Sequence, residues 1–169
     1  MAKKDKKIPK ERINDESISN SGSLGSTELE KKIFDFPTVN KDGKRDNIEN
    51  KKPYVVLKYF QTGWECFSDW TPQELKAFSA FLNLLSSHTW GSVYRSGGKG
   101  ENKSGLGYTV YDVEKMKAGK AILTSVREKL SPDISFFELR VSQKLRVHGF
   151  QSQAAFFLVM LDREHKVFP

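Results

Sequence analysis

Two carboxyl-terminal segments of the chain place acidic, basic and imidazole side chains at alternate positions. In the segment FELR the alternate residues are Glu138 and Arg140, and in the segment RVHG they are Arg146 and His148. Successive side chains of a strand point to opposite faces, so these four residues are expected to project from one face of a hairpin. His165 follows the next apolar segment. These five residues are the candidate catalytic set.

This set of side chains could cleave RNA without a metal ion. Glu138 could remove the proton from a ribose 2′-hydroxyl, and His165 or His148 could protonate the leaving oxygen. Arg140 and Arg146 could hold the phosphate through paired hydrogen bonds that a lysine cannot make. The arginines would also stabilise the extra negative charge that develops on phosphorus in the transition state.

The same residues also have a structural interpretation. Opposite charges paired across strands commonly satisfy a solvent-facing sheet, and a histidine among apolar neighbours, such as His148, is commonly buried and hydrogen-bonded. The segment from Asp162 to His165 could be a terminal turn with surface ion pairs of small energy. Metal binding is not predicted, because His88, His148 and His165 lack the close spacing of metal ligands.

Four further basic residues are candidates for binding the substrate. Arg163 and Lys166 follow the third strand segment and could fold over one rim of the charged face. Arg95 and Lys99 lie in the segment from Gly91 to Gly107, which contains six glycines. Backbone amides of such a segment can approach phosphates, but the spacing of a P-loop is missing. A mobile loop able to close over a substrate is therefore predicted.

Residues 134–169 predict a three-stranded antiparallel meander that positions the candidate residues. Its first two segments alternate apolar and polar residues, the third is almost entirely apolar, and short polar connections separate them. The segment YVVLKYF after Pro53 is rich in β-branched and aromatic residues and predicts a fourth strand. One face of this sheet is expected to be apolar and the other to carry the charged residues.

The first predicted helix begins with a strong start signal. Thr71 and Glu74 have the spacing of a capping box, and Pro72 occupies the first helical position, where its missing amide costs nothing. The apolar pattern ends near His88. Five residues at three- and four-residue spacing form a stripe that must pack against the sheet: Leu75, Phe78, Phe81, Leu82 and Leu85.

The second predicted helix spans Val113 to Leu130, with Asp112 as its N-cap and Pro132 after its end. A short strand is predicted at residues 108–111. Residues 1–52 are rich in Lys, Glu, Asp, Asn, Ser and Gly, a composition that buries too little apolar surface to offset the entropy of ordering. They are predicted to form a disordered or loosely docked leader.

The composition is that of a chain with one hydrophobic core. The 169 residues are 37% hydrophobic, and the net charge of +7 favours an anionic partner such as nucleic acid. Cys66 is the only cysteine, so an internal disulfide is excluded and a reducing cytoplasm fits best. No apolar segment follows the amino-terminal lysines, and the longest apolar run, residues 154–161, is too short to span a membrane. Neither export nor membrane insertion is expected.

The order of these elements resembles the RelE/YoeB-type toxin fold of bacterial toxin-antitoxin systems. The resemblance covers residues 53–169. It rests on one strand, two helices and a meander whose second strand reads LRVHGF and whose third strand is followed by a basic, histidine-bearing end. The resemblance implies cleavage of mRNA, with RNA or the ribosome and a cognate antitoxin protein as partners.

The resemblance also implies roles for individual residues. It makes Arg146 the arginine of the middle strand and His165 the carboxyl-terminal acid. Glu138 and Arg140 are the charged positions of the preceding strand, and Phe168 stands where a tyrosine is often found near the end.

The sequence therefore predicts an α+β domain at residues 53–169, with an antiparallel sheet of about four strands packed against two helices. The predicted function is that of a cytoplasmic, metal-independent endoribonuclease or RNA-binding toxin that acts on mRNA and needs no cofactor. The alternative is a non-enzymatic module that binds a protein or a nucleic acid through the same charged face of the sheet.

Overall fold

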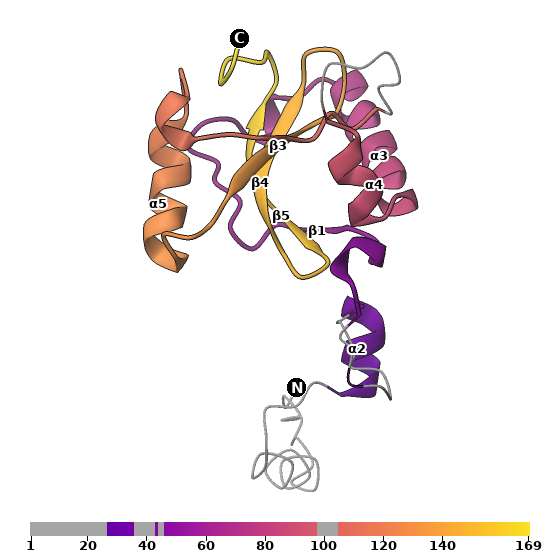
Figure 1. Cartoon of the computed structure of the whole chain (residues 1–169). Helices are drawn as coiled ribbons and strands as arrows, with labels where there is room; N and C mark the ends of the chain where they lie inside the picture. The colour runs from indigo at the N-terminus through magenta and orange to yellow at the C-terminus, as the bar shows by residue number, and fades with distance from the viewer. Residues whose placement is uncertain (1–26, 36–42, 44–45, 98–104) are drawn as a thin grey trace, which may run out of the picture. The chain divides into compact units, whose positions relative to one another are not determined.

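The computed structural model divides the chain into two compact units, residues 1–33 and residues 34–169. The second unit contains the sheet and the candidate residues (Figure 1). The structure describes the following residues: 27–35, 43, 46–97 and 105–169. Among the helices of these segments, none is both long enough and apolar enough to cross a membrane.

Parts of the predicted leader are helical. The Thr27 hydroxyl accepts a hydrogen bond from the Glu30 amide, and the Glu30 carboxylate accepts one from the Thr27 amide, at the start of α2 (Glu28–Phe34). A short 3-10 helix, η1 (Ile48–Asn50), precedes the first strand. Residues 1–26 of the leader lie outside the described residues.

The core of the second unit is a five-stranded mixed sheet, which confirms the predicted α+β class. The predicted meander is present, and its three strands pair antiparallel in chain order. The predicted antiparallel sheet is in fact mixed, because β1 pairs parallel with β5. The strand count is five rather than about four, and the fifth strand, β2, falls within the short strand predicted at residues 108–111. The order is β1-β5-β4-β3-β2. The strands are β1 (Tyr54–Val56), β2 (Thr109–Val110), β3 (Phe136–Arg140), β4 (Arg146–Ser152) and β5 (Ala155–Asp162).

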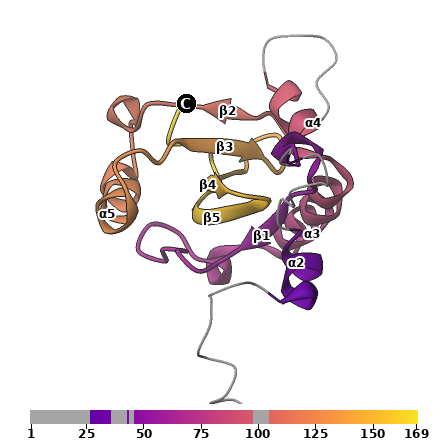
Figure 2. The same ribbon diagram turned by 60° about the horizontal axis from the view of Figure 1, so that its bottom comes forward.

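Helices cover both faces of the sheet. In Figure 2, α3 (Pro72–Ser87) and α4 (Trp90–Arg95) lie on one side and α5 (Lys120–Leu130) lies on the other. Phe81 and Leu85 of α3 pack with apolar side chains of the first face, and Leu123 of α5 packs with those of the second. The expectation of one apolar and one charged face therefore does not hold, because the charged residues share their face with an apolar core.

The first predicted helix is confirmed together with its start signal. The Thr71 hydroxyl accepts from the Glu74 amide at 3.3 Å, and the Glu74 carboxylate accepts from the Thr71 amide at 2.7 Å. The helix begins at Pro72, and His88 caps its end. Of the predicted stripe, Phe81 and Leu85 are buried, whereas Leu75 is exposed.

The second predicted helix is shorter than the apolar pattern indicated. Residues Val113–Lys115 form a separate 3-10 turn, and α5 starts only at Lys120. Between them the Lys117 amide donates to the Val167 carbonyl, and this bond holds the segment beside the carboxyl-terminal residues. Gly119 adopts a left-handed conformation with φ +72°, and a Cβ there would lie 2.8 Å from the Met160 sulfur. Glycine suits this position for both reasons.

The first residues of the predicted glycine-rich loop are helical. Thr89 and Ser92 form a capping box, and α4 runs through the first part of the predicted loop. The Trp90 side chain is fully buried, and its indole N–H donates to the Ala154 carbonyl at 3.0 Å. This bond ties the start of α4 to the sheet. Lys99, a predicted binding residue of this loop, lies outside the described residues.

Candidate functional site

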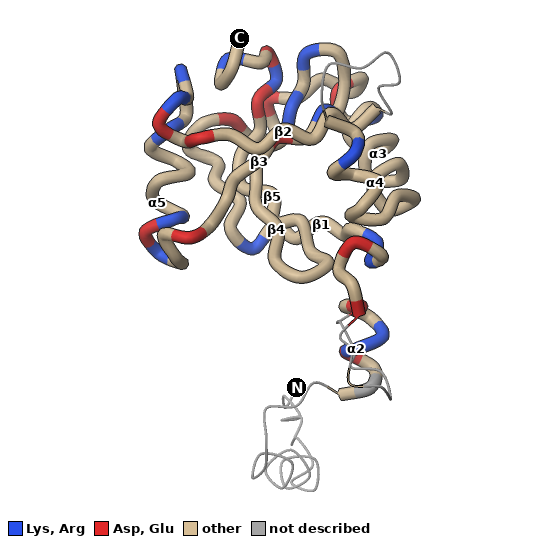
Figure 3. Tube along the Cα trace, viewed as in Figure 1, with Lys and Arg blue, Asp and Glu red and all other residues tan. Residues whose placement is uncertain are grey.

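The charged residues of the sheet gather at one end. Figure 3 shows the charged positions of β3, β4 and β5 near the carboxyl terminus, whereas the hairpin at the opposite end carries none. The strand register places Glu138 beside His148 and Arg140 beside Arg146, and Arg146 lies beside Asp162 on the other flank. The predicted alternation is confirmed by this pairing, and all five side chains lie on the face that α5 covers.

Glu138 lies between two possible cations. Its Oε1 atom is 4.0 Å from Nε of Arg146 and 3.9 Å from Nε2 of His165. The Glu138 residue is only 7% exposed, and its Oε2 atom is buried without a hydrogen-bond partner. A buried carboxylate oxygen with no partner is costly.

Arg146 is held in place by the backbone. Its Nη1 atom donates to the carbonyl oxygens of Ser142, Gln143 and Leu145, at 2.9, 3.3 and 3.2 Å. Burial, and next the charge of Arg140, lower the pKa of the Arg146 guanidinium from its ordinary value. The group still carries a full charge at neutral pH, because an arginine titrates far above that range.

Arg140 lies beneath the end of the glycine-rich segment. Its backbone amide donates to the Leu106 carbonyl at 2.6 Å, and a Cβ at Gly107 would lie 3.3 Å from Nε and Cζ of its guanidinium. Nε of Arg140 is buried and has no hydrogen-bond partner. Among the described residues, Arg140 forms no ion pair. Two arginines therefore face each other, and the carboxylates of Glu138 and Asp162 both lie near Arg146 rather than paired with Arg140. This arrangement suits an anion beside Arg140.

His148 is buried behind this group. Its ring is fully inaccessible to solvent, with Nδ1 lying 2.8 Å from the Tyr111 hydroxyl and Nε2 lying 3.6 Å from Oδ2 of Asp162. Burial, together with the charges of Glu138 and Asp162, raises the pKa of the Tyr111 phenol well above its ordinary value. Tyr111 therefore stays protonated and can donate its hydrogen.

Asp162 organises the carboxyl-terminal turn. Its Oδ1 accepts from the Lys166 amide at 2.8 Å, and its Oδ2 accepts from the Val167 amide at 3.0 Å. Burial acts to raise the pKa of Asp162, but the interaction with His148 and the two amides outweigh it, so the pKa lies below its ordinary value. The residue inside this turn, His165, has a left-handed backbone with φ +58°.

The structure distributes the predicted site residues unevenly. It brings Glu138, Arg146 and His165 together and places Arg140 beside them. Arg163 instead binds the Glu74 carboxylate of α3 through Nε and Nη2, at 3.0 and 2.9 Å.

The remaining predicted binding residues lie elsewhere. Lys166 pairs with Glu164 at 2.6 Å in the exposed turn. Arg95 is exposed at the end of α4, which packs on the opposite face of the sheet.

Sequence reasoning gave Tyr111 no role and considered Asp162 only as part of a terminal turn with surface ion pairs, whereas Asp162 is fully buried. Asp162 follows eight mostly apolar residues directly, and a carboxylate at the end of such a strand is a signal for a capping role. Tyr111 has no comparable signal, because only the fold brings it to His148. Among the described residues, no group of three or more His, Cys, Asp or Glu side chains could hold a metal ion.

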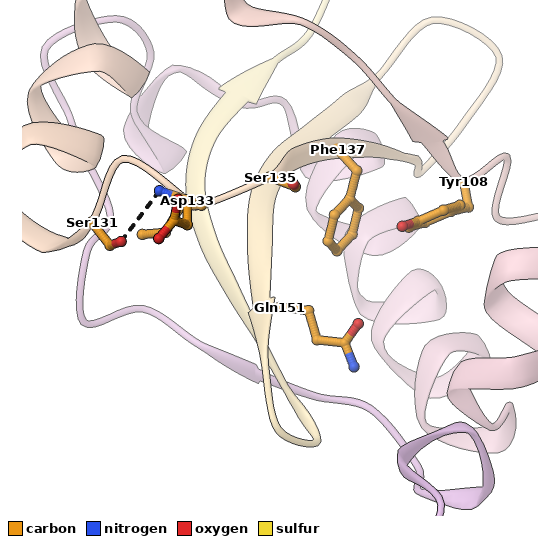
Figure 4. Close-up of a pocket in the computed structure, with 7 residues that line it drawn as sticks. Tyr108, Ser131, Asp133, Ser135, Phe137 and Gln151 are labelled. Carbon is orange, nitrogen blue, oxygen red and sulfur yellow. Dashed lines mark hydrogen bonds between the residues drawn. The ribbon is translucent and has the colours of Figure 1, made fainter.

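A separate cavity of about 370 Å³ opens on the other face of the sheet. Figure 4 shows Tyr108, Phe137 and Gln151 converging on it, with Ser131 and Asp133 at its far side. Gln151 is already engaged, because its amide oxygen accepts from the Tyr94 hydroxyl and its nitrogen donates to the Gln153 carbonyl. The cavity does not contain any residue of the predicted catalytic set.

No family model, no curated protein and no solved structure matches the chain. The chemistry of the site is therefore argued from its own side chains: a buried carboxylate, an imidazole in a constrained turn and two guanidinium groups.

Proposed function

We propose that the protein is a metal-independent endoribonuclease that acts on mRNA, with the charged end of the sheet as its active site. One observation carries the proposal: the buried Glu138 carboxylate faces the His165 imidazole and the Arg146 guanidinium at 3.9 and 4.0 Å. A base, an acid and a phosphate-binding cation are the three groups that this reaction requires.

The reaction begins with proton removal by Glu138. Its carboxylate takes the proton of a ribose 2′-hydroxyl, and the 2′-oxygen forms a bond to the adjacent phosphorus. The bond between phosphorus and the 5′-oxygen of the next nucleotide breaks, and protonated His165 gives that oxygen a proton. The products are a 2′,3′-cyclic phosphate and a 5′-hydroxyl, so no external reactant is consumed.

The two arginines stabilise the phosphate during this step. Arg146 is fixed by three backbone carbonyls and lies beside Arg140, whose Nε has no partner. Their guanidinium groups can donate to the phosphate oxygens as negative charge increases on them. Preorganised donors of this kind are typically worth about 3 kcal/mol of transition-state stabilisation each.

His165 rather than His148 is the acid in this proposal. The His165 side chain is 32% exposed and lies next to Glu138, so it can contact a bound phosphodiester. The His148 side chain has no exposed surface, and Tyr111 and Asp162 lie at its two ring nitrogens. Direct contact with a substrate requires an accessible ring, which His165 has and His148 lacks.

The direct test is cleavage of a labelled mRNA fragment by the full-length chain in the presence of EDTA, with and without programmed ribosomes. Glu138→Gln keeps the shape of the side chain and removes the base, so cleavage should fall by at least about 100-fold. His165→Asn should cause a similar loss, because asparagine tolerates the left-handed backbone but cannot donate as an imidazolium.

A matched control is Glu114→Gln, because Glu114 is an exposed carboxylate paired with Lys120 outside the site. It should cleave as the wild type does. Wild-type protein that leaves the RNA intact under both conditions refutes the proposal. So does a folded Glu138→Gln variant with undiminished cleavage and with a 2′,3′-cyclic phosphate still formed.

The alternative function is a non-enzymatic module that binds RNA or a protein through the same residues. The observation that favours it is the burial of the site, because Glu138 and Arg146 are each only 7% exposed. A module of this kind would bind RNA without producing new ends, and Glu138→Gln would not lower its affinity. Measuring binding and cleavage on the same RNA distinguishes the two functions.

The proposal extends to the family and setting of the protein. A strand, two principal helices and an antiparallel meander support a RelE/YoeB-like toxin, and such a toxin would have an antitoxin protein as its partner. A cytoplasmic location agrees with the single cysteine. Expression in a bacterial host, followed by growth measurement and primer-extension mapping of transcripts, tests this setting.

A further inference from the structure

We propose that Tyr111, His148 and Asp162 form a buried polar chain that positions the carboxyl-terminal turn and, with it, His165. The three residues come from three segments: the connection after β2, strand β4 and the end of β5. Their role in catalysis rests on the proposed ribonuclease activity. Their role in holding the turn does not, and it is measurable separately.

The geometry determines which hydrogen each group carries. Nε2 of His148 faces Oδ2 of Asp162 at 3.6 Å, too far for a formed hydrogen bond, and it has no hydrogen-bond partner among the described residues. The negative charge of Asp162, whose pKa lies below its ordinary value, favours a proton on Nε2 rather than on Nδ1. Nδ1 is then unprotonated and accepts from the Tyr111 hydroxyl at 2.8 Å. Tyr111 is a competent donor because burial keeps its phenol protonated. The tautomer with its proton on Nε2 lets Nδ1 accept from Tyr111 and directs the Nε2 hydrogen toward Asp162.

The surroundings of His148 contain few other ionisable groups. Glu138 lies beside it on β3, Tyr111 lies at one edge of its ring, and Asp162 lies at the other. Its partner on β5 in the strand register is the apolar Met160. No group other than Tyr111 is placed to donate to Nδ1 among the described residues, so that hydroxyl is what selects the tautomer.

The polar chain of Tyr111, His148 and Asp162 ends at the backbone of the carboxyl-terminal turn. Asp162 accepts from the amides of Lys166 and Val167, on the carboxyl-terminal side of His165. These two bonds close the turn in which His165 takes its left-handed backbone, a conformation that is unfavourable for an L-residue. The same turn holds the His165 ring 3.9 Å from Glu138. Asp162 therefore fixes the direction in which His165 points.

Apolar side chains would fill the space of His148 and Asp162 at a lower cost in desolvation free energy. His148 and Asp162 are completely buried, and taking a carboxylate and an imidazole out of water is unfavourable unless their bonds are well made. Such a network specifies one arrangement, because alternative positions leave its members without partners. A defined position of His165 next to Glu138 is the feature that this arrangement produces.

The first experiment measures the tautomer directly. Nitrogen-15 NMR of the wild-type chain should show the His148 ring protonated at Nε2 and unprotonated at Nδ1. A ring protonated at Nδ1 refutes the proposal, because the Tyr111 hydroxyl and Asp162 would then be arranged differently. This measurement requires no variant and no substrate.

The second experiment removes the donor with Tyr111→Phe, which keeps the ring that packs against Phe168. The amide protons of Lys166 and Val167 should exchange at least about tenfold faster, because the hold of Asp162 on the turn weakens. With RNA, kcat should fall about tenfold or more while KM changes little, because His165 acts in the transition state and not in substrate binding.

Tyr94→Phe is the matched control. It removes a hydroxyl that bonds Gln151 at 2.5 Å on the opposite face of the sheet, and it should alter neither the exchange nor kcat. A folded Tyr111→Phe variant with unchanged exchange of both amides refutes the positioning role. If the wild type does not cleave RNA, the proposed function is refuted. The His148 tautomer and the exchange rates of the Lys166 and Val167 amides still test the positioning role.

Discussion

Arg140 and Arg146 face each other directly across β3 and β4. Among the described residues, Nε of Arg140 has no hydrogen-bond partner, and the Glu138 carboxylate that pairs with Arg146 lies 4.0 Å from its Nε. Like charges in directly opposite positions of a sheet are unfavourable, so an anion bound between them should stabilise the fold. This relationship leads to the first prediction.

Inorganic phosphate should raise the melting temperature of the protein. At a concentration tenfold above the dissociation constant, linkage gives about 1.4 kcal/mol of stabilisation. In Arg140→Gln most of this effect should disappear, whereas Arg95→Gln, at an exposed position on α4, should retain it. Calorimetry in phosphate and in chloride of equal ionic strength measures the difference. Equal phosphate effects in the two variants would contradict an anion site at Arg140.

The Arg163–Glu74 pair should make the stability of the fold sensitive to acid. Hydrogen bonds from Arg163, and next the Thr71 amide, lower the pKa of Glu74 from 4.5 to about 2. The contribution of the ionised carboxylate is therefore present above about pH 4.5 and is lost as the pH falls toward 2. Glu74→Gln should cost about 1 kcal/mol at pH 7, a modest figure because the pair is partly exposed and also caps α3.

Urea denaturation of this variant at pH 7, 4 and 2.5 measures the effect. The difference from the wild type should shrink as the solution becomes more acidic. Glu128→Gln, an exposed substitution on α5, should show no such trend. A difference that is constant over this range would show that the carboxylate charge is not responsible.

Gly149→Ala should destabilise the sheet strongly. Gly149 lies next to the irregularity between β4 and β5, and a Cβ there would overlap the Phe157 carbonyl oxygen and approach the Phe156 ring to 2.7 Å. Because the overlap is with backbone, relief requires the strands to separate, at a cost of about 3 kcal/mol. Gly63→Ala, whose Cβ would meet only the Ile122 side chain at 3.8 Å, should be nearly neutral. Chemical denaturation of both variants tests the difference.

Local patterns in the sequence determined the elements that depend on neighbouring residues. The start of α3 was predictable because Thr71 and Glu74 bond each other's backbone within one turn. The common face of Glu138, Arg140, Arg146 and His148 was predictable because side chains alternate along any strand. The helix at Trp90 was missed, because the glycines that follow it suggested a loop and its capping residue Thr89 was overlooked.

Only the tertiary structure decided how these elements surround the site. The parallel pairing of β1 with β5 and the covering of the charged face by α5 depend on how the chain crosses the sheet, which periodicity does not encode. Contacts between distant segments then determined the partner of each polar side chain. Arg163 binds Glu74, Tyr111 bonds His148, and Asp162 holds the turn that contains His165. The sequence by itself determined which residues share a face. Packing decided which of them are buried partners and which one, His165, is accessible next to Glu138.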